Sequence, residues 1–128
     1  NIDNKPMKCL HIITPVKDSI DSTLDTVKAI MESDILVPFT YTVYNDFSTE
    51  ENTHRLEEAA RQWNFRLVNL SDLTDHPSPN YLLVLQTAQK EAIEADAGLL
   101  IVESDVIVKK NHYTMEHCNR SNAELQQL

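Results

Sequence analysis

Four short apolar segments recur along the chain, each bounded by polar or turn-forming residues. They cover residues 9–13, 39–44, 65–70 and 98–102. The first and the last are nearly continuous apolar runs, as strands buried on both faces are. The middle two alternate between apolar and polar positions, which is typical of strands with two different faces. The pattern therefore predicts four β-strands.

Between these segments, apolar residues recur at the spacing of a helix, and each stretch starts with residues suited to a helix N-terminus. These starts are Asp18 or Ser19 for the first helix, Ser48 with Glu51 as a capping box for the second, and Ser78 followed by Pro79 for the third. The side chains expected to face the core are Ile20, Leu24, Val27 and Met31, then Leu56, Ala59, Ala60 and Trp63, then Leu82, Leu85, Ala88, Ala92 and Ile93.

Strands and helices thus alternate, which favours a parallel sheet with right-handed crossovers. Such crossovers place the second strand beside the first and the third beyond it, and the fourth returns to the other side of the first. We predict an α/β fold with three layers, α/β/α, and a mainly parallel sheet in the strand order 3-2-1-4. The domain is expected to span residues 1–110, followed by a polar tail at 111–128.

Polar clusters follow three of the four predicted strands. They are residues 14–18 after the first strand, 45–48 after the second and 103–105 after the fourth. Ligands of open parallel sheets bind beyond the carboxyl ends of the strands, at the point where the strand order reverses. We therefore expect the functional site at this edge, with Thr14 and Asp105 in the same crevice.

Glu103 and Asp105 form an acid-x-acid pair directly after an apolar strand. Two residues apart in an extended segment, both carboxylates project to the same side and can share one divalent cation. Hard oxygen ligands suit Mg²⁺ or Mn²⁺. The alternative is a solvated loop that merely begins with acidic residues. Asp46 has an alternative role as well, because Asn-Asp before Ser is a common turn and helix start.

The charge of the chain restricts its partners. A formal net charge of −9 repels nucleic acids and anionic membranes, so nucleic acid is not an expected partner. Any anionic ligand must be held by a metal ion, a few local bases or backbone amides. Gly98 is the only glycine, which excludes glycine-rich phosphate-binding loops.

Two further features bear on the compartment. The chain has no run of 18 or more apolar residues, so no membrane-spanning segment is predicted. Cys9 lies in a predicted strand and Cys118 in the polar tail, an unfavourable pair for a disulfide. These observations favour a reducing compartment and a cytoplasmic location.

Taken together, the three clusters resemble the amino-terminal half of family 2 glycosyltransferases, which have the GT-A fold. Residues 8–18, with Thr14-Pro15-Val16-Lys17-Asp18, resemble the family's first strand and nucleotide loop. Residues 43–50 resemble its Asp-Asp-Gly-Ser-Thr-Asp segment, and residues 100–105 resemble the strand that leads to its Asp-x-Asp metal motif. The chain departs from the family pattern in four ways. Asn45 replaces the first Asp, Phe47 replaces Gly, and Glu103 replaces the first Asp of the metal motif. The helix before the fourth strand also lacks the family's Asn and Gly pattern.

The resemblance implies an inverting glycosyltransferase, or its donor-binding half, that uses a nucleoside diphosphate sugar such as a UDP- or GDP-sugar. Thr14, Pro15 and Asp18 would line the base and ribose, and Asp46 would accept a hydrogen bond from the base. Glu103 would contact the ribose, and Glu103 with Asp105 would hold Mn²⁺ or Mg²⁺. The polar tail would be the start of a missing acceptor half, which carries the family's catalytic base, so no catalytic base is assigned and the fragment alone is expected to transfer no sugar.

Two other interpretations remain. In the first, the domain is a non-catalytic module that binds a nucleotide or a partner protein. In the second, it is a receiver-like signalling domain with Asp46 as phosphoacceptor, although such domains need an acidic pair where this chain has Thr14-Pro15. A zinc site at His112, His117 and Cys118 is disfavoured because no second ligand cluster accompanies it.

Overall fold

The computed structural model describes residues 9–104, which form three layers. In chain order the elements are β1 (Leu10–Val16), α1 (Ile20–Met31), β2 (Phe39–Asn45), α2 (Glu50–Trp63), β3 (Arg66–Asn69), the 3-10 turn η2 (Leu70–Asp72), α3 (Tyr81–Glu94) and β4 (Gly98–Ile101). All the predicted strands and helices are present, and no end is shifted by more than three residues. The predicted boundary at residue 110 and the tail at 111–128 lie outside the described residues.

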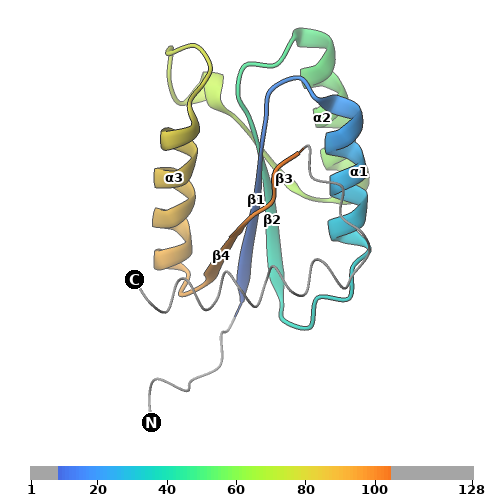
Figure 1. Ribbon diagram of the computed structural model, residues 1–128, viewed down its shortest axis with the longest axis vertical. Helices are drawn as coiled ribbons and strands as arrows, with labels where there is room; N and C mark the ends of the chain where they lie inside the picture. The colour runs from blue at the N-terminus through green and yellow to red at the C-terminus, as the bar shows by residue number, and fades with distance from the viewer. Residues whose placement is uncertain (1–8, 105–128) are drawn as a thin grey trace.

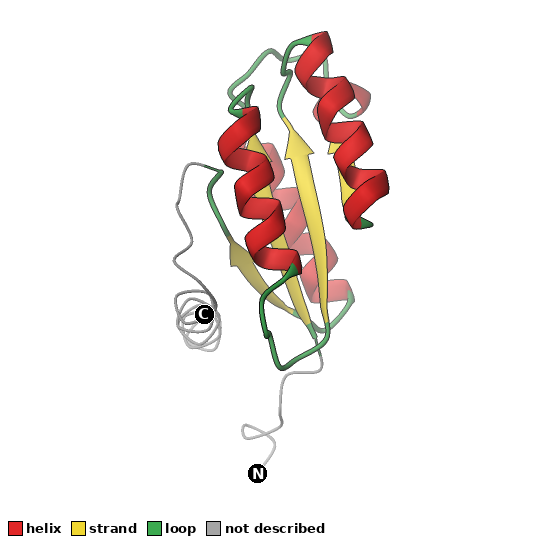
Figure 2. Ribbon diagram, turned by 90° about the vertical axis from the view of Figure 1, so that its right-hand side faces the viewer, coloured by secondary structure: helices red, strands yellow, loops and turns green. Residues whose placement is uncertain are grey.

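The sheet confirms the predicted topology. Its four strands are parallel in the order β3-β2-β1-β4, so β1 lies between β2 and β4. Successive right-handed crossovers through α1 and α2 move in one direction along the sheet, and the return through α3 reverses that direction. As a result α1 and α2 cover one face and α3 covers the other (Figure 1). Figure 2 views the molecule from the side of α1 and α2.

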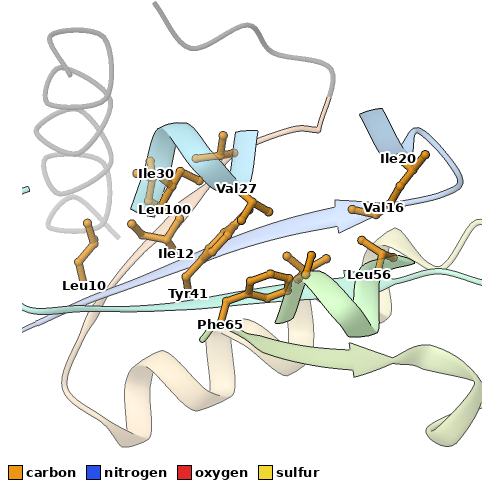
Figure 3. Close-up of a cluster of buried hydrophobic side chains, with 13 residues drawn as sticks. Leu10, Ile12, Val16, Ile20, Val27, Ile30, Tyr41, Leu56, Phe65 and Leu100 are labelled. Carbon is orange, nitrogen blue, oxygen red and sulfur yellow. The ribbon is translucent and has the colours of Figure 1, made fainter. Parts of the chain in front are cut away.

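The larger hydrophobic core lies between the sheet and the pair α1 and α2 (Figure 3). It is centred on Ile12, Val27, Ile30, Val43 and Leu56, whose side chains are fully buried. A smaller core under α3 contains Ile13, Tyr44, Leu70, Val84 and Ala88. Burial on both faces explains the near-continuous apolar sequence of β1.

Pro15 lies within a central strand, a position that normally needs a backbone N–H group. The pairing of β1 with β4 stops at Ile13, whereas the pairing with β2 continues to Val16. In the β1 strand, the Ile13 carbonyl faces the β4 side, where it accepts from Val102. Pro15 has the same orientation as Ile13, so its missing donor faces a place where β4 has already ended.

Two predicted helix starts are wrong. The N-cap of α2 is Thr49, whose hydroxyl accepts a hydrogen bond from the Asn52 backbone at 3.2 Å, rather than Ser48 with Glu51. The N-cap of α3 is Asn80 rather than Ser78. In both cases the predicted cap instead makes a longer-range contact: the Ser48 hydroxyl accepts from the Asp18 backbone, and the Ser78 hydroxyl donates to Asp46.

The predicted inner face of α3 is also partly wrong. Leu82 and Ile93 are 67% and 71% exposed, whereas Val84, Ala88 and Ala92 are buried. The later start at Tyr81 does not explain the error, because it leaves the spacing of the apolar residues unchanged. The apolar residues of α3 occupy more than one face of the helix, so their periodicity alone could not predict which face packs against the sheet. No helix among residues 9–104 is both long and apolar enough to cross a membrane.

Candidate functional site

The loops after β1 and β2 begin side by side at the carboxyl edge of the sheet, at the top of Figure 1. The segment after β4 begins lower, because β4 ends beside Ile13. The Asp46 backbone N–H donates to the Val16 carbonyl at 2.7 Å, which extends the pairing of β1 and β2 by one residue. The Val102 N–H donates to the Ile13 carbonyl at 2.9 Å and keeps β4 against β1. The topology therefore assembles the predicted clusters at one edge.

Asp18 fastens the loop after β1 to the start of α2. Its carboxylate Oδ1 accepts hydrogen bonds from the Thr49 backbone at 2.7 Å and from the Asn52 side chain at 3.2 Å. The Thr49 bond, followed by the Asn52 bond, lowers the pKa of Asp18 below its usual range. A negative charge is favourable at this position because a helix N-terminus carries partial positive charge. The second oxygen, Oδ2, lies 3.9 Å from Lys17 Nζ.

Asn45 ties the ends of β2 and β3 to α2. Its buried side-chain amide donates to Thr53 Oγ1 at 2.8 Å and to Asn69 Oδ1 at 2.9 Å, and its Oδ1 accepts from the Ser48 backbone at 3.2 Å. A carboxylate offers acceptors only, so an ionised Asp here would lose both donor bonds. This pairing accounts for Asn at the position where the resembling family has its first Asp.

Phe47 adopts a left-handed backbone conformation, with φ 64°. Such a conformation is unfavourable for a residue with a Cβ atom and natural for glycine, which is the residue of the resembling family at this position. The ring is half-buried against the core under α3. Packing of the ring offsets the strain of the backbone, and the local chain path is kept without a glycine.

Asp46 is buried, with 8% of its surface exposed, and its carboxylate holds the start of α3. Oδ2 accepts from the Ser78 hydroxyl at 2.9 Å and from the Asn80 backbone at 2.8 Å. Oδ1 accepts from the Asn80 side-chain amide at 2.9 Å. The predicted base acceptor is thus engaged by its own chain.

Thr14 and Pro15 lie at the same edge but differ in access. Thr14 is fully buried, and its hydroxyl accepts a hydrogen bond from Tyr41 at 2.7 Å. Burial raises the pKa of the Tyr41 phenol, so Tyr41 remains a donor. Pro15 is half-buried. Of the two, Pro15 offers the more accessible surface, and Thr14 anchors β1 to β2.

The segment after β4 carries the predicted metal ligands. Glu103 is exposed. The pKa of Tyr81 at the start of α3 is raised, mainly by burial of the phenol and also by the negative charge of Glu103. The neighbouring Ser104 carbonyl accepts from Thr26 Oγ1 of α1 at 3.4 Å. Glu103 therefore lies at the carboxyl edge, between the start of α3 and α1. Asp105 lies outside the described residues.

The donor set can be compared with the cation predicted there. Glu103 supplies a hard, exposed carboxylate of the type that Mg²⁺ and Mn²⁺ prefer. Within residues 9–104, no group of three or more His, Cys, Asp or Glu side chains is placed to hold a metal ion. Of the two predicted metal ligands, Glu103 is the one that the described residues include.

A second polar network lies near the amino ends of the strands, on the face covered by α3. Glu91 of α3 accepts from Arg66 at 2.6 Å and from the Tyr44 hydroxyl at 3.3 Å, and it lies 3.4 Å from His11 Nε2. The Arg66 bond lowers the pKa of Glu91, and burial raises the pKa of Tyr44 to about 12.

His11 of β1 is buried. Its Nδ1 lies 2.8 Å from the Thr40 hydroxyl, whereas Nε2 has no well-oriented hydrogen bond despite its distance from Glu91. Burial lowers the pKa of His11.

A cavity of about 770 Å³ adjoins this second network, lined among others by His11, Thr42, Arg66 and Glu91. It lies away from the carboxyl edge. Its lining combines residues from both faces of the sheet, and two of its charged residues, Arg66 and Glu91, are paired with each other. Size alone does not make it the functional site, because ligands of open parallel sheets bind at the carboxyl ends of the strands.

Comparison with known proteins gives a match in structure only. No protein-family model and no curated protein matches the sequence. A mannosyltransferase from Pyrobaculum calidifontis, solved with GDP-Man and Mn²⁺, matches with a TM-score of 0.67 and 15% identity over 94% of this chain and 34% of its own. TarS from S. aureus, residues 1–349, matches with a TM-score of 0.63 and 18% identity over 91% of this chain and 33% of its own.

A third match is glucosyl-3-phosphoglycerate synthase from Mycobacterium tuberculosis, solved with UDP, with a TM-score of 0.55 and 16% identity. It covers 89% of this chain and 39% of its own. The chain has the fold of GT-A glycosyltransferases. It spans 33–39% of the length of these three structures. The predicted fold and the predicted resemblance are both confirmed at the level of the fold.

Sequence reasoning missed several residues at this edge that the structure brings together: Thr49, Asn52, Ser78 and Asn80. Each contacts Asp18 or Asp46 from about 30 residues away along the chain. The excess of hydroxyl and amide side chains after β2 and before α3 was visible in the sequence. Their partners were not, because they depend on how the loops fold over the sheet edge.

Proposed function

We propose that this chain is the donor-binding part of a glycosyltransferase and binds a nucleoside diphosphate sugar at the carboxyl edge of its sheet. The observation that carries the proposal is the meeting of the loops after β1, β2 and β4 at one edge of a GT-A fold. Support comes from structures of the same fold solved with nucleotide ligands: GDP-Man and Mn²⁺ in the mannosyltransferase and UDP-GlcNAc in TarS.

In this proposal the roles are those that the resemblance implies. Pro15 and the loop that holds Asp18 line the base and ribose, and Thr14 supports them from beneath. Asp46 accepts a hydrogen bond from the base, and Glu103 contacts the ribose. Each is set at the end of a strand or on a loop tied to α2 or α3 by the hydrogen bonds described above.

Glu103 and Asp105 would hold a Mn²⁺ or Mg²⁺ ion together with the diphosphate. Such an ion, when bound, neutralises negative charge on the diphosphate leaving group. The need for it follows from the charge of the chain, since a net charge of −9 gives no general attraction for a diphosphate. Lys17 is a local base at this edge, and its ammonium already donates to the Phe47 carbonyl.

Calorimetry with UDP, GDP and CMP, each with and without Mn²⁺, tests the proposal. We expect a UDP or GDP affinity that depends on Mn²⁺, and Asp105→Asn should remove most of that dependence because it replaces a charged ligand with a neutral one of the same shape. Fold stability should hardly change. If Asp105→Asn binds nucleotide and Mn²⁺ as well as the parent does, the glycosyltransferase assignment of this site fails.

One observation favours a second candidate, a non-catalytic module that binds a nucleotide or a partner protein. The carboxylates of Asp18 and Asp46 are already engaged by the chain's own donors. Under this alternative, nucleotide affinity is absent or insensitive to metal. The 128-residue chain, which spans about a third of the matched structures, is expected to transfer no sugar to an added acceptor under either candidate. Robust transfer by the purified chain would show that it carries a catalytic base and acceptor surface of its own.

A further inference from the structure

Asp46 has little capacity left for a ligand. An ionised carboxylate has two oxygens with about four lone-pair sites in total. Oδ2 accepts from both Ser78 and the Asn80 backbone, and Oδ1 accepts from the Asn80 side chain. The residue is also only 8% exposed. A base that is to hydrogen-bond with Asp46 therefore meets an acceptor covered by Ser78 and Asn80.

The segment that covers Asp46 is residues 73–80, which connects η2 to α3 and is drawn as a loop at the carboxyl edge in Figure 1. Its residues are mostly exposed. Further hydrogen bonds in the segment are local: Thr74 Oγ1 accepts from the His76 backbone at 3.1 Å, and the His76 carbonyl accepts from the Asn80 side chain at 2.9 Å. The segment can leave Asp46 without breaking the sheet.

Both ends of the segment are fixed. Leu70 is fully buried in the core under α3, and the Asn80 carbonyl accepts from Val84 in the first turn of α3. Ser78, inside the segment, and Asn80, at its end, donate three hydrogen bonds to the carboxylate of Asp46. Among residues 9–104, these bonds tie the segment to the edge of the sheet at the candidate nucleotide site.

We propose that residues 73–80 act as a latch that competes with the nucleotide base for Asp46, so that Ser78 and Asn80 set the affinity of the site for its donor. The inference rests on the proposed function. Donor binding exchanges the hydrogen bonds from Ser78 and Asn80 for bonds from the base, and the segment moves away from the sheet edge. A ligand shifts such an equilibrium only by its differential affinity for the two states, so weakening the latch strengthens binding.

Ser78→Ala tests the latch because it removes one bond to Asp46 and leaves the N-cap of α3 in place. Calorimetry with UDP and GDP in the presence of Mn²⁺ should show binding tighter than in the parent by about three- to tenfold, the equivalent of one net hydrogen bond. The matched control is Thr74→Ala, which removes a hydroxyl of the same segment that bonds to His76 and not to Asp46. Its affinity should equal that of the parent.

Hydrogen exchange of the unmodified chain gives a second measurement that does not depend on a variant. The Asn80 backbone N–H, which donates to Asp46, should exchange faster when nucleotide is bound. Slower exchange, or a folded Ser78→Ala that binds the nucleotide no more tightly than the parent does, overturns the latch and leaves the proposed function standing. If parent and variant both fail to bind UDP and GDP with Mn²⁺, the proposed function fails and the latch fails with it.

Discussion

The two polar networks of this domain are built from different parts of the chain. At the carboxyl edge, loop hydroxyls, loop amides and backbone N–H groups at helix starts converge on Asp18 and Asp46. Near the amino ends, side chains from three strands converge on Glu91 of α3. The first network joins loops to one another, and the second fastens a helix to the sheet.

This difference separates sites that can respond to a ligand from sites that hold the fold. Loops can change their hydrogen-bond partners while the sheet stays intact, and binding residues occur preferentially on loops held by a rigid scaffold. In the second network, Tyr44 is fully buried in the core under α3, so its movement would disturb that core. The large cavity beside the second network is therefore a poorer candidate than the loop-lined edge, despite its volume of about 770 Å³.

Asp46→Ala should produce the largest loss of stability. It removes the acceptor of three hydrogen bonds and leaves the Asn80 N–H unpaired, which we expect to lower the free energy of unfolding by about 3 kcal/mol. Urea unfolding measures the change. Asp75→Ala, an exposed acid in the same segment, is the control and should stay within about 0.5 kcal/mol of the parent. Equal effects of the two substitutions would show that the Asp46 contacts are not formed in solution.

Glu91→Gln should have a smaller effect on the second network. The amide keeps the shape but weakens the bond from Arg66 and the interaction with His11, and the side chain is 36% exposed, so solvent reduces the loss to about 1 kcal/mol. Thermal unfolding at low and high salt measures it. Nucleotide affinity should not change, since Glu91 lies away from the carboxyl edge. A drop in affinity would link the two networks and contradict their separation.

Phe47 offers a comparison between two small residues. Both Phe47→Ala and Phe47→Gly lose the packing of the ring, but only glycine relieves the left-handed backbone. The glycine variant should therefore be more stable than the alanine variant by about 1 kcal/mol, the reverse of the order at ordinary positions. Chemical denaturation of the two variants measures this difference in the free energy of unfolding. An alanine variant at least as stable as the glycine variant would exclude backbone strain at this loop.

The smallest expected effect is a pH dependence from His11. Burial lowers the pKa of His11 below 6.5, so the unfolded chain binds its proton more readily than the folded chain does. The contribution of neutral His11 to the free energy of unfolding is fully present above pH 6.5, and it should decline as the pH falls below 6.5. The lowered pKa of Glu91 adds a separate loss below pH 4.5. His11→Gln should remove the decline between pH 6.5 and pH 5.5 in thermal melts. An unchanged decline in that variant would assign it to another group.

Most of the fold could be predicted because its elements depend on local patterns. Apolar runs located the strands, and the alternation of strands and helices, with right-handed crossovers, gave the sheet order. The errors arose where local rules competed with distant partners. Ser48 and Ser78 look like helix caps in the sequence, yet their hydroxyls bond to Asp18 and Asp46 across the loops.

The candidate site was predictable in place but not in detail. Asp18 and Asp46 were selected because they follow strands, and the structure brings both to the same edge. The hydrogen bonds that their carboxylates already accept could not be inferred from the sequence. The donor to Asp18 is Asn52 and the donor to Asp46 is Asn80, each 34 residues further along the chain. Asn45 and Phe47 looked like departures from a family pattern. The structure gives each a physical reason, a pair of donor bonds for Asn45 and ring packing for Phe47.

The central claim is that the carboxyl edge, and not the cavity beside Glu91, binds the nucleotide. Titration of the ¹⁵N-labelled chain with UDP or GDP in the presence of Mg²⁺, followed by NMR, tests it directly. The claim predicts that the largest amide shifts occur at Asp18, Asp46 and Asn80, while His11 and Arg66 change little. Shifts concentrated at His11 and Arg66, or no shifts at saturating nucleotide, would contradict it.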